Sequence, residues 1–134
     1  MGNFMFKRIL DAADVLRPRA AGNGGTSAQR KAAIHLVGRG KDLYNTKRYS
    51  EAAEVFRQAI AEDPVYARAH CYLGNTLHQL GAPEEAVKEW KKAVIVEPDS
   101  DSAAKAQAKL DKIAAHNQQV TRSLEENLGF HKQG

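Results

Sequence analysis

The sequence predicts an all-α fold of stacked helix hairpins, an α-solenoid, and three observations favour it. The chain of 134 residues repeats itself at an interval of 34 residues. Its apolar residues recur at the three- and four-residue spacing of helix faces, and proline or glycine separates the apolar segments. Repeats of about 20 to 50 residues are typical of stacked architectures, so each unit should bury its apolar face on its neighbour.

Residues 1–17 predict an amphipathic helix, and residues 18–27, rich in glycine and small side chains, predict a flexible linker. The apolar face of the helix comprises Met5, Phe6, Ile9, Leu10, Ala12, Ala13 and Leu16. Its polar face carries two cations and two acids, whereas membrane-surface helices usually have a strongly basic face. We therefore expect Ile9, Leu10 and Leu16 to dock on protein, with the seam from Leu110 to Leu124 as the expected partner, within one chain or between two chains. A membrane surface is the alternative.

Residues 28–100 predict one repeat domain. Its two units, residues 33–66 and 67–100, align when the chain is shifted against itself by 34 residues. The aligned pairs are Leu36 with His70, Gly40 with Gly74, Leu43 with Leu77, Ala52 with Ala86, Phe56 with Trp90, Ala59 with Ala93 and Pro64 with Pro98. Each unit predicts two helices, and its proline should end the second one because the residue before a proline disfavours the helical conformation.

Small residues predict how the two helices of a unit pack together. A bulky side chain at Gly74 would hold the first helix away from the second, on which Ala86 presents a matching small surface. The Trp90 side chain should then fill the space beside them. The same relation is expected among the counterparts of these residues in the first unit.

This pattern of small residues, one aromatic residue and a closing proline resembles the tetratricopeptide repeat over residues 33–100. The resemblance implies an α-solenoid of two tetratricopeptide helix hairpins. The sequence departs from the family pattern at Leu36 and His70, where Trp is usual, at Arg39, where Leu is usual, and at Pro83, where Tyr is usual.

The resemblance also implies a concave groove, lined by the first helices of successive repeats, that holds a peptide or helix of a partner. The family's groove positions are Ile34, Val37, Gly38, Lys41, Tyr44, Asn45, Arg68, Cys71, Tyr72, Asn75, His78 and Gln79 in this sequence. We expect peptide binding at Lys41, Tyr44, Asn45, Arg68, Tyr72, Asn75, His78 and Gln79; a solvated groove without a ligand is the alternative. The family's carboxylate clamp is not expected, because Cys71 and Ala106 replace its basic residues.

Residues 101–128 predict one long C-terminal helix that caps the second unit, followed by a tail at 129–134. A seam with heptad spacing comprises Ala103, Ala106, Leu110, Ile113, Asn117, Val120 and Leu124. Either the seam covers only its own domain, or Leu110, Ile113, Asn117, Val120 and Leu124 form a self-association or helix-docking surface. In the second case the polar Asn117 would set the register.

Charge and composition limit the function classes. The net charge is +4, but residues 32–100 carry nine Lys and Arg against ten acids, so nucleic-acid binding is not expected. No segment has the roughly 18 apolar residues that a membrane span requires. Without a phosphate-binding loop, a nucleophile motif or metal-ligand spacing, we predict no enzymatic activity, no cofactor and no metal site.

These observations favour a non-enzymatic adaptor or scaffold that binds a protein or peptide partner. A homo-oligomer is possible through the C-terminal seam. The single cysteine, Cys71, fits a reducing cytoplasmic compartment. The alternative is a peripheral membrane or assembly-organising protein that is anchored by residues 1–17.

Overall fold

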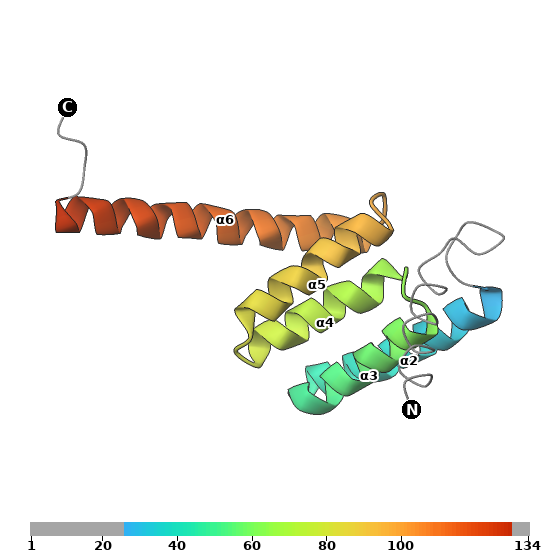
Figure 1. Cartoon of the computed structure of the whole chain (residues 1–134). Coiled ribbons are helices and arrows are strands. Elements are labelled where there is room, and N and C mark those ends of the chain that lie inside the picture. The colour runs from blue at the N-terminus through green and yellow to red at the C-terminus, as the bar shows by residue number, and fades with distance from the viewer. Residues whose placement is uncertain (1–25, 130–134) are drawn as a thin grey trace, which may run out of the picture.

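The computed structural model of the chain describes residues 26–129, which form α-helices and no strand. The helices are α2 (Ser27–Asn45), α3 (Tyr49–Glu62), α4 (Ala67–Gln79), α5 (Pro83–Val96) and α6 (Asp101–Leu128). As Figure 1 shows, α2 pairs with α3, α4 pairs with α5, and α6 packs on the second hairpin. The predicted all-α solenoid is confirmed. The predicted N-terminal helix, with Ile9, Leu10 and Leu16, lies outside the described residues.

Helix ends follow from local sequence. The Thr26 side chain accepts a hydrogen bond from the Gln29 amide, and the Gln29 side chain accepts one from the Thr26 amide, so α2 begins at Ser27. This start lies before residue 33, where the sequence repeat begins. Gly81 ends the turn after α4 with φ of 83°, a left-handed conformation that glycine adopts without strain, and Pro83 opens α5.

The predicted close approach of paired helices is confirmed in both hairpins. A methyl group placed on Gly74 would lie 2.5 Å from the Trp90 ring, and one on Gly40 would overlap the Phe56 ring. Trp90 is 2% exposed and Phe56 is fully buried. The glycines therefore let each aromatic ring lie directly against the backbone of the neighbouring helix.

An ionic cluster ties the two repeats together at one end of the stack. The Arg30 side chain on α2 donates to the fully buried carboxylate of Asp63 at 2.5 Å and to Glu97 at 3.2 Å. Its guanidinium also lies 4.4 Å from the centre of the Tyr66 ring. Glu97 accepts a second hydrogen bond from the Ala67 amide at 2.8 Å. One arginine thus joins two acids that occupy equivalent positions in the two repeats.

Helix α6 is twice as long as the helix it covers. With 28 residues against 14 in α5, it is about 42 Å long against about 21 Å, at 1.5 Å per residue. Ala103 and Ala106 are buried and Leu110 and Ile113 pack against the core, whereas every residue from 114 to 129 is exposed. The outer half of α6 therefore projects beyond the repeats (Figure 1). None of the described helices is both long and apolar enough to cross a membrane.

Candidate functional site

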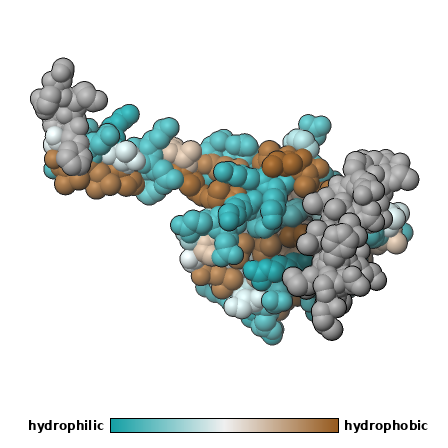
Figure 2. Space-filling model, in the orientation of Figure 1, coloured by the Kyte–Doolittle hydropathy of each residue, from teal (hydrophilic) through white to brown (hydrophobic). Residues whose placement is uncertain are grey.

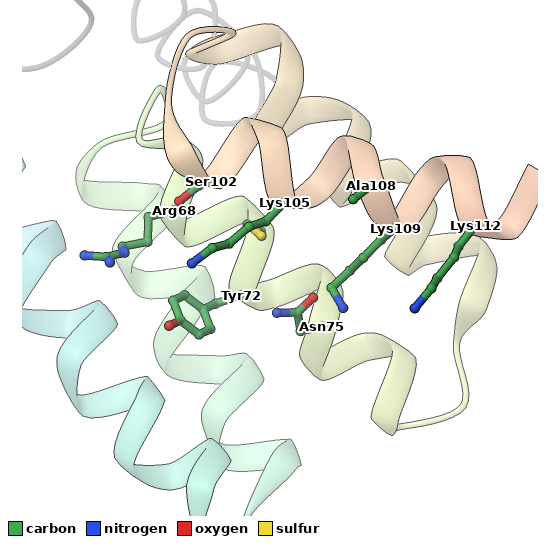
Figure 3. A pocket seen from close by; sticks show the side chains of 9 residues that line it. Arg68, Tyr72, Asn75, Ser102, Lys105, Ala108, Lys109 and Lys112 are labelled. Carbon is green, nitrogen blue, oxygen red and sulfur yellow. The ribbon is translucent and has the colours of Figure 1, made fainter.

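A groove of about 420 Å³ lies between α4 and α6. Its lining consists of Arg68, Cys71, Tyr72 and Asn75 from α4 and Ser102, Lys105, Ala108, Lys109 and Lys112 from α6. The α4 set follows the spacing i, i+3, i+4 and i+7, and the α6 set follows i, i+3, i+6, i+7 and i+10, which places each set on one face of its helix. Figure 3 shows the lysine side chains extending from α6 toward α4, where Tyr72 and Asn75 lie.

The groove is strongly cationic. Four of its nine lining residues are Arg or Lys and none is acidic. Among residues 26–129, no ion pair involves Arg68, Lys105, Lys109 or Lys112. The Lys109 ammonium lies 5.7 Å from the centre of the Trp90 ring, so its stem is held across the wall of the groove. Because these cations are exposed and unneutralised by neighbouring side chains, the groove attracts anions.

Tyr72 and Asn75 are oriented by neighbours in the core. The Tyr72 ring stacks on Phe56, with ring centres 5.5 Å apart and planes inclined by 15°, and the Lys41 ammonium lies 5.9 Å from the Tyr72 ring centre. The Asn75 side-chain oxygen accepts a hydrogen bond from the Trp90 indole at 3.0 Å. Since this bond uses the amide oxygen, the NH₂ group of Asn75 is left to donate into the groove.

Cys71 also lines the groove, but it is not an activated thiol. Burial raises its pKa above the ordinary value, and the nearby charges of Lys109, Lys105 and Arg68 only partly oppose that effect. The thiol is therefore neutral at neutral pH, and it serves as a small apolar part of the wall.

The structure places the predicted peptide-binding residues in different surroundings. Arg68, Tyr72 and Asn75 line the groove together, and Lys41 lies beside Tyr72. Tyr44 makes an edge contact with Tyr49 at 5.2 Å between ring centres. Burial, followed by the neighbouring Tyr49, raises the pKa of the Tyr44 hydroxyl. We therefore regard Tyr44 mainly as a packing residue.

The remaining predicted positions lie at the margins. The His78 ring is 5.9 Å from the Trp90 ring, while Asn45 and Gln79 are exposed at the C-terminal ends of α2 and α4 and do not line the groove. Val37, one of the family's groove positions, is only 2% exposed and belongs to the core. A ligand could not reach its side chain.

Sequence reasoning overlooked Lys105, Lys109 and Lys112. The residues follow steps of four and three, so a search for cations on one helix face would have found them. Residues 101–128 have the pattern of a capping helix, and the family's carboxylate clamp has a counterpart there only at Ala106, so neither feature points to these lysines. The contacts between α4 and α6 show that this cap is also a wall of the groove.

Comparison with known proteins identifies the family to which the repeats belong. The family model described as tetratricopeptide repeat matches residues 37–104, half of the chain. The chain belongs to the tetratricopeptide repeat family. It is 33% identical over 72 residues to Small glutamine-rich tetratricopeptide repeat-containing protein 2 of Saccharomyces cerevisiae, covering 54% of this chain and 21% of that protein. The chain thus matches about a fifth of the length of this relative.

A solved structure shares the tetratricopeptide fold. It is described as the second TPR of Spaghetti (RPAP3) bound to HSP90 peptide SRMEEVD, and it has a TM-score of 0.55 and 23% identity. The match covers 74% of this chain and 97% of that one. At this level of identity the likeness shows the fold.

The tetratricopeptide pattern is altered at His70, which stands where Trp is usual. The buried His70 ring contacts the Pro64 carbonyl oxygen through Nε2 at 2.7 Å and a Glu89 carboxylate oxygen through Nδ1 at 2.9 Å. The Pro64 carbonyl and the Glu89 carboxylate are both hydrogen-bond acceptors, so the two bonds hold the ring between Pro64 and α5. Within residues 26–129, no group of three His, Cys, Asp or Glu side chains could hold a metal ion.

The His70–Glu89 pair predicts destabilisation in acid. Burial raises the pKa of the Glu89 carboxyl group, but the hydrogen bond and charge of His70, followed by those of Lys92, outweigh burial and bring the pKa below its ordinary value of 4.5. The stabilisation is therefore present above pH 4.5 and is lost as pH falls through the lower, folded-state pKa.

In urea unfolding from about pH 6 to about pH 3, Glu89→Gln should lose less stability than the unaltered chain. The matched control is Glu51→Gln, which removes an exposed carboxylate paired with Arg48 and should follow the unaltered chain more closely. Equal losses in the Glu89→Gln variant and the unaltered chain would contradict this role of Glu89.

Proposed function

We propose that this chain is a non-enzymatic protein-interaction module that binds an acidic, extended segment of a partner protein in the groove between α4 and α6. The observation that carries the proposal is the set of four cations in the groove, which has no acidic residue in its lining. Family membership supports the interaction role, because the solved tetratricopeptide structure that this chain resembles is bound to a peptide.

The groove offers three kinds of contact to such a segment. Lys105, Lys109 and Lys112 supply point charges for Asp and Glu side chains, and the Arg68 guanidinium can donate two parallel hydrogen bonds to one carboxylate. The NH₂ group of Asn75 can donate to a peptide carbonyl. The Tyr72 ring provides an apolar platform between these polar groups.

The structural neighbour supports this ligand class, because the peptide in its title, SRMEEVD, contains three acidic residues. In the present chain, however, the cations of α6 are spread along the groove, and Cys71 occupies the position of the clamp's lysine. The proposed ligand is therefore recognised mainly by acidic side chains along its length. A free terminal carboxylate is not required.

The test uses synthetic peptides of about ten residues, rich in Glu and Asp, with either a free or an amidated C-terminus. Fluorescence anisotropy should show binding of both forms, weakened by salt and by replacement of Glu and Asp with Gln and Asn. Lys105→Ala combined with Lys109→Ala should weaken binding by about tenfold, which corresponds to about 1.4 kcal/mol. Helical circular dichroism should be unchanged, because both lysines are exposed.

The control is Lys88→Ala combined with Lys91→Ala, which removes the same charge from exposed positions on α5 outside the groove. This variant should bind almost as well as the unaltered chain. Equal weakening by both double variants would show attraction to net charge and not to the groove. Binding that depends on the free C-terminus would instead point to recognition of a terminal carboxylate.

Two further proposals concern location and membrane binding. We propose a cytoplasmic location, because the single cysteine, Cys71, fits a reducing compartment. The alternative of a membrane-anchored assembly protein depends on residues 1–17, outside the described residues, and flotation of the full chain with liposomes tests it. Flotation that Leu10→Asp abolishes would favour the membrane role.

A further inference from the structure

The outer half of α6 carries an apolar stripe that the repeats do not cover. Val120, Leu124 and Leu128 are 42%, 54% and 61% exposed. Figure 2 shows the hydrophobic surface following one edge of this projecting half of the helix. Contiguous exposed apolar surface on an otherwise polar helix is typical of an interaction site.

This stripe continues the seam by which α6 packs on the repeats. Leu110 and Ile113 pack against the core, and Asn117, Val120 and Leu124 follow at steps of four, three and four residues. Heptad spacing keeps all of these positions on one helix face. The seam thus continues past the part of α6 that packs on the repeats, since α6 is twice as long as α5 and projects beyond the second hairpin (Figure 1).

We propose that this seam binds the same seam of a second copy of the chain, with the two α6 helices antiparallel. A two-fold interface requires a surface that is complementary to itself. The seam has such a centre between Gln118 and Gln119. Ile113 and Leu124 lie equally far from this centre along the helix, on opposite sides of it, and so do Asn117 and Val120. An antiparallel pair therefore sets the exposed part of Ile113, which is only partly buried against its own core, against Leu124 of the second copy, and Asn117 against Val120.

Asn117 favours one register of this pair. The two Asn117 side chains lie on opposite sides of the two-fold axis, offset by about 4.5 Å along the helices, given a rise of 1.5 Å per residue. Each amide can donate and accept, so the two can bond across the axis. A single polar residue in an apolar seam specifies register at some cost in stability.

Charge along α6 also favours the antiparallel orientation. Lys105, Lys109 and Lys112 lie in its first half, and Glu125 and Glu126 lie near its end. Antiparallel pairing brings the acidic end of one helix toward the lysine-rich half of the other. Parallel pairing would place like charges at the same level, which is unfavourable.

Placement of the repeats favours a second copy over a segment of the same chain. Helix α2 begins at Ser27, on the far side of the repeats from the free end of α6 (Figure 1). For the apolar residues predicted near the N-terminus to reach the free end of α6, the connecting residues 17–26 would have to bridge that separation. A second copy is not restricted by the length of a connecting segment. In an antiparallel pair its repeats lie at the opposite end of the two helices.

Light scattering of the full chain tests the pairing. Its mass should approach twice the chain mass of 14.7 kDa at high concentration and return toward 14.7 kDa on dilution, since the seam is short. Leu124→Asp should leave the chain a folded monomer. The control, Ile95→Asp, alters a residue that is 74% exposed on α5 outside the seam, and it should dimerise like the unaltered chain.

Disulfide trapping tests the orientation. His116 and Ser123 immediately precede Asn117 and Leu124, and both are exposed. In an antiparallel pair, these two positions face one another on the flank of the seam. Chains with His116→Cys and chains with Ser123→Cys should therefore crosslink when mixed and oxidised, and neither should crosslink efficiently alone. The native Cys71 is buried and should not compete.

Three results would overturn the proposal. The first is a chain that stays monomeric at every concentration. The second is a dimer that Leu124→Asp leaves intact, and the third is crosslinking by either cysteine variant alone. A monomer whose residues 114–128 are nevertheless protected in hydrogen exchange would show that the chain covers its own seam.

Discussion

Arg30→Ala is expected to lower the free energy of unfolding by about 3 kcal/mol, the lower end of the range for breaking a buried ion pair, because it leaves a buried carboxylate without its partly exposed cation. Asp63 is fully buried, and Arg30 donates to it at 2.5 Å while also contacting Glu97 and the Tyr66 ring. The only other hydrogen bond that the described residues offer the Asp63 carboxylate is a long one, 3.3 Å from the Val65 amide. Urea unfolding followed by circular dichroism measures the loss.

The matched control is Arg48→Ala, which removes an arginine from an exposed pair with Glu51 and should change stability little. Replacing Asp63 together with Arg30 by Ala should cost less than the sum of the two single changes, because no unpaired charge then remains buried. Additive effects, or similar losses for Arg30→Ala and Arg48→Ala, would show that the buried pair does not hold the repeats together.

Gly74→Leu is expected to cost about 3 kcal/mol, the upper end of the range for overpacking a core. Even a methyl group at this position would lie 2.5 Å from the Trp90 ring. Trp90 is 2% exposed and its indole donates to Asn75, so the ring cannot move aside without breaking that bond. Thermal unfolding should show a clearly lower midpoint, and the groove should lose the orientation of Asn75.

Gly38→Leu provides the control at a helical glycine of the same chain. A methyl group placed on Gly38 meets no atom within 4 Å, and leucine favours the helix by roughly 0.8 kcal/mol over glycine. This variant should therefore be as stable as the unaltered chain, or slightly more stable. Unchanged stability in Gly74→Leu would count against the close packing of α4 on α5.

The repeat made the fold predictable before any contact was known. Pairs such as Gly40 with Gly74 and Phe56 with Trp90 record both the position and the size of residues that meet, so sequence spacing carries three-dimensional information. The ionic cluster could not be found in this way. Arg30 lies before the repeat, and Asp63 and Glu97 are 33 and 67 residues away from it along the chain.

The groove was predictable on one wall only. Arg68, Tyr72 and Asn75 followed from the family pattern on α4, but the facing lysines belong to a helix outside the two recognised repeats. Side chains at 68 and 105 share a groove because α6 packs across α4 and α5. No local spacing relates residues on two helices that are joined through a third.

By itself, the sequence determined the helices, their hairpin pairing and the 34-residue stacking unit, because these depend on side-chain periodicity, small residues and prolines within a short stretch of chain. Only the tertiary structure decided which charges are buried, which cations meet in one groove and where the α6 seam leaves the core. The physical reason is that burial and charge proximity depend on how helices of unequal length are placed against each other. Leu110 and Leu124 share one seam in the sequence, but Leu110 packs on the core and Leu124 faces solvent, because the outer half of α6 projects beyond the hairpin on which its first half packs.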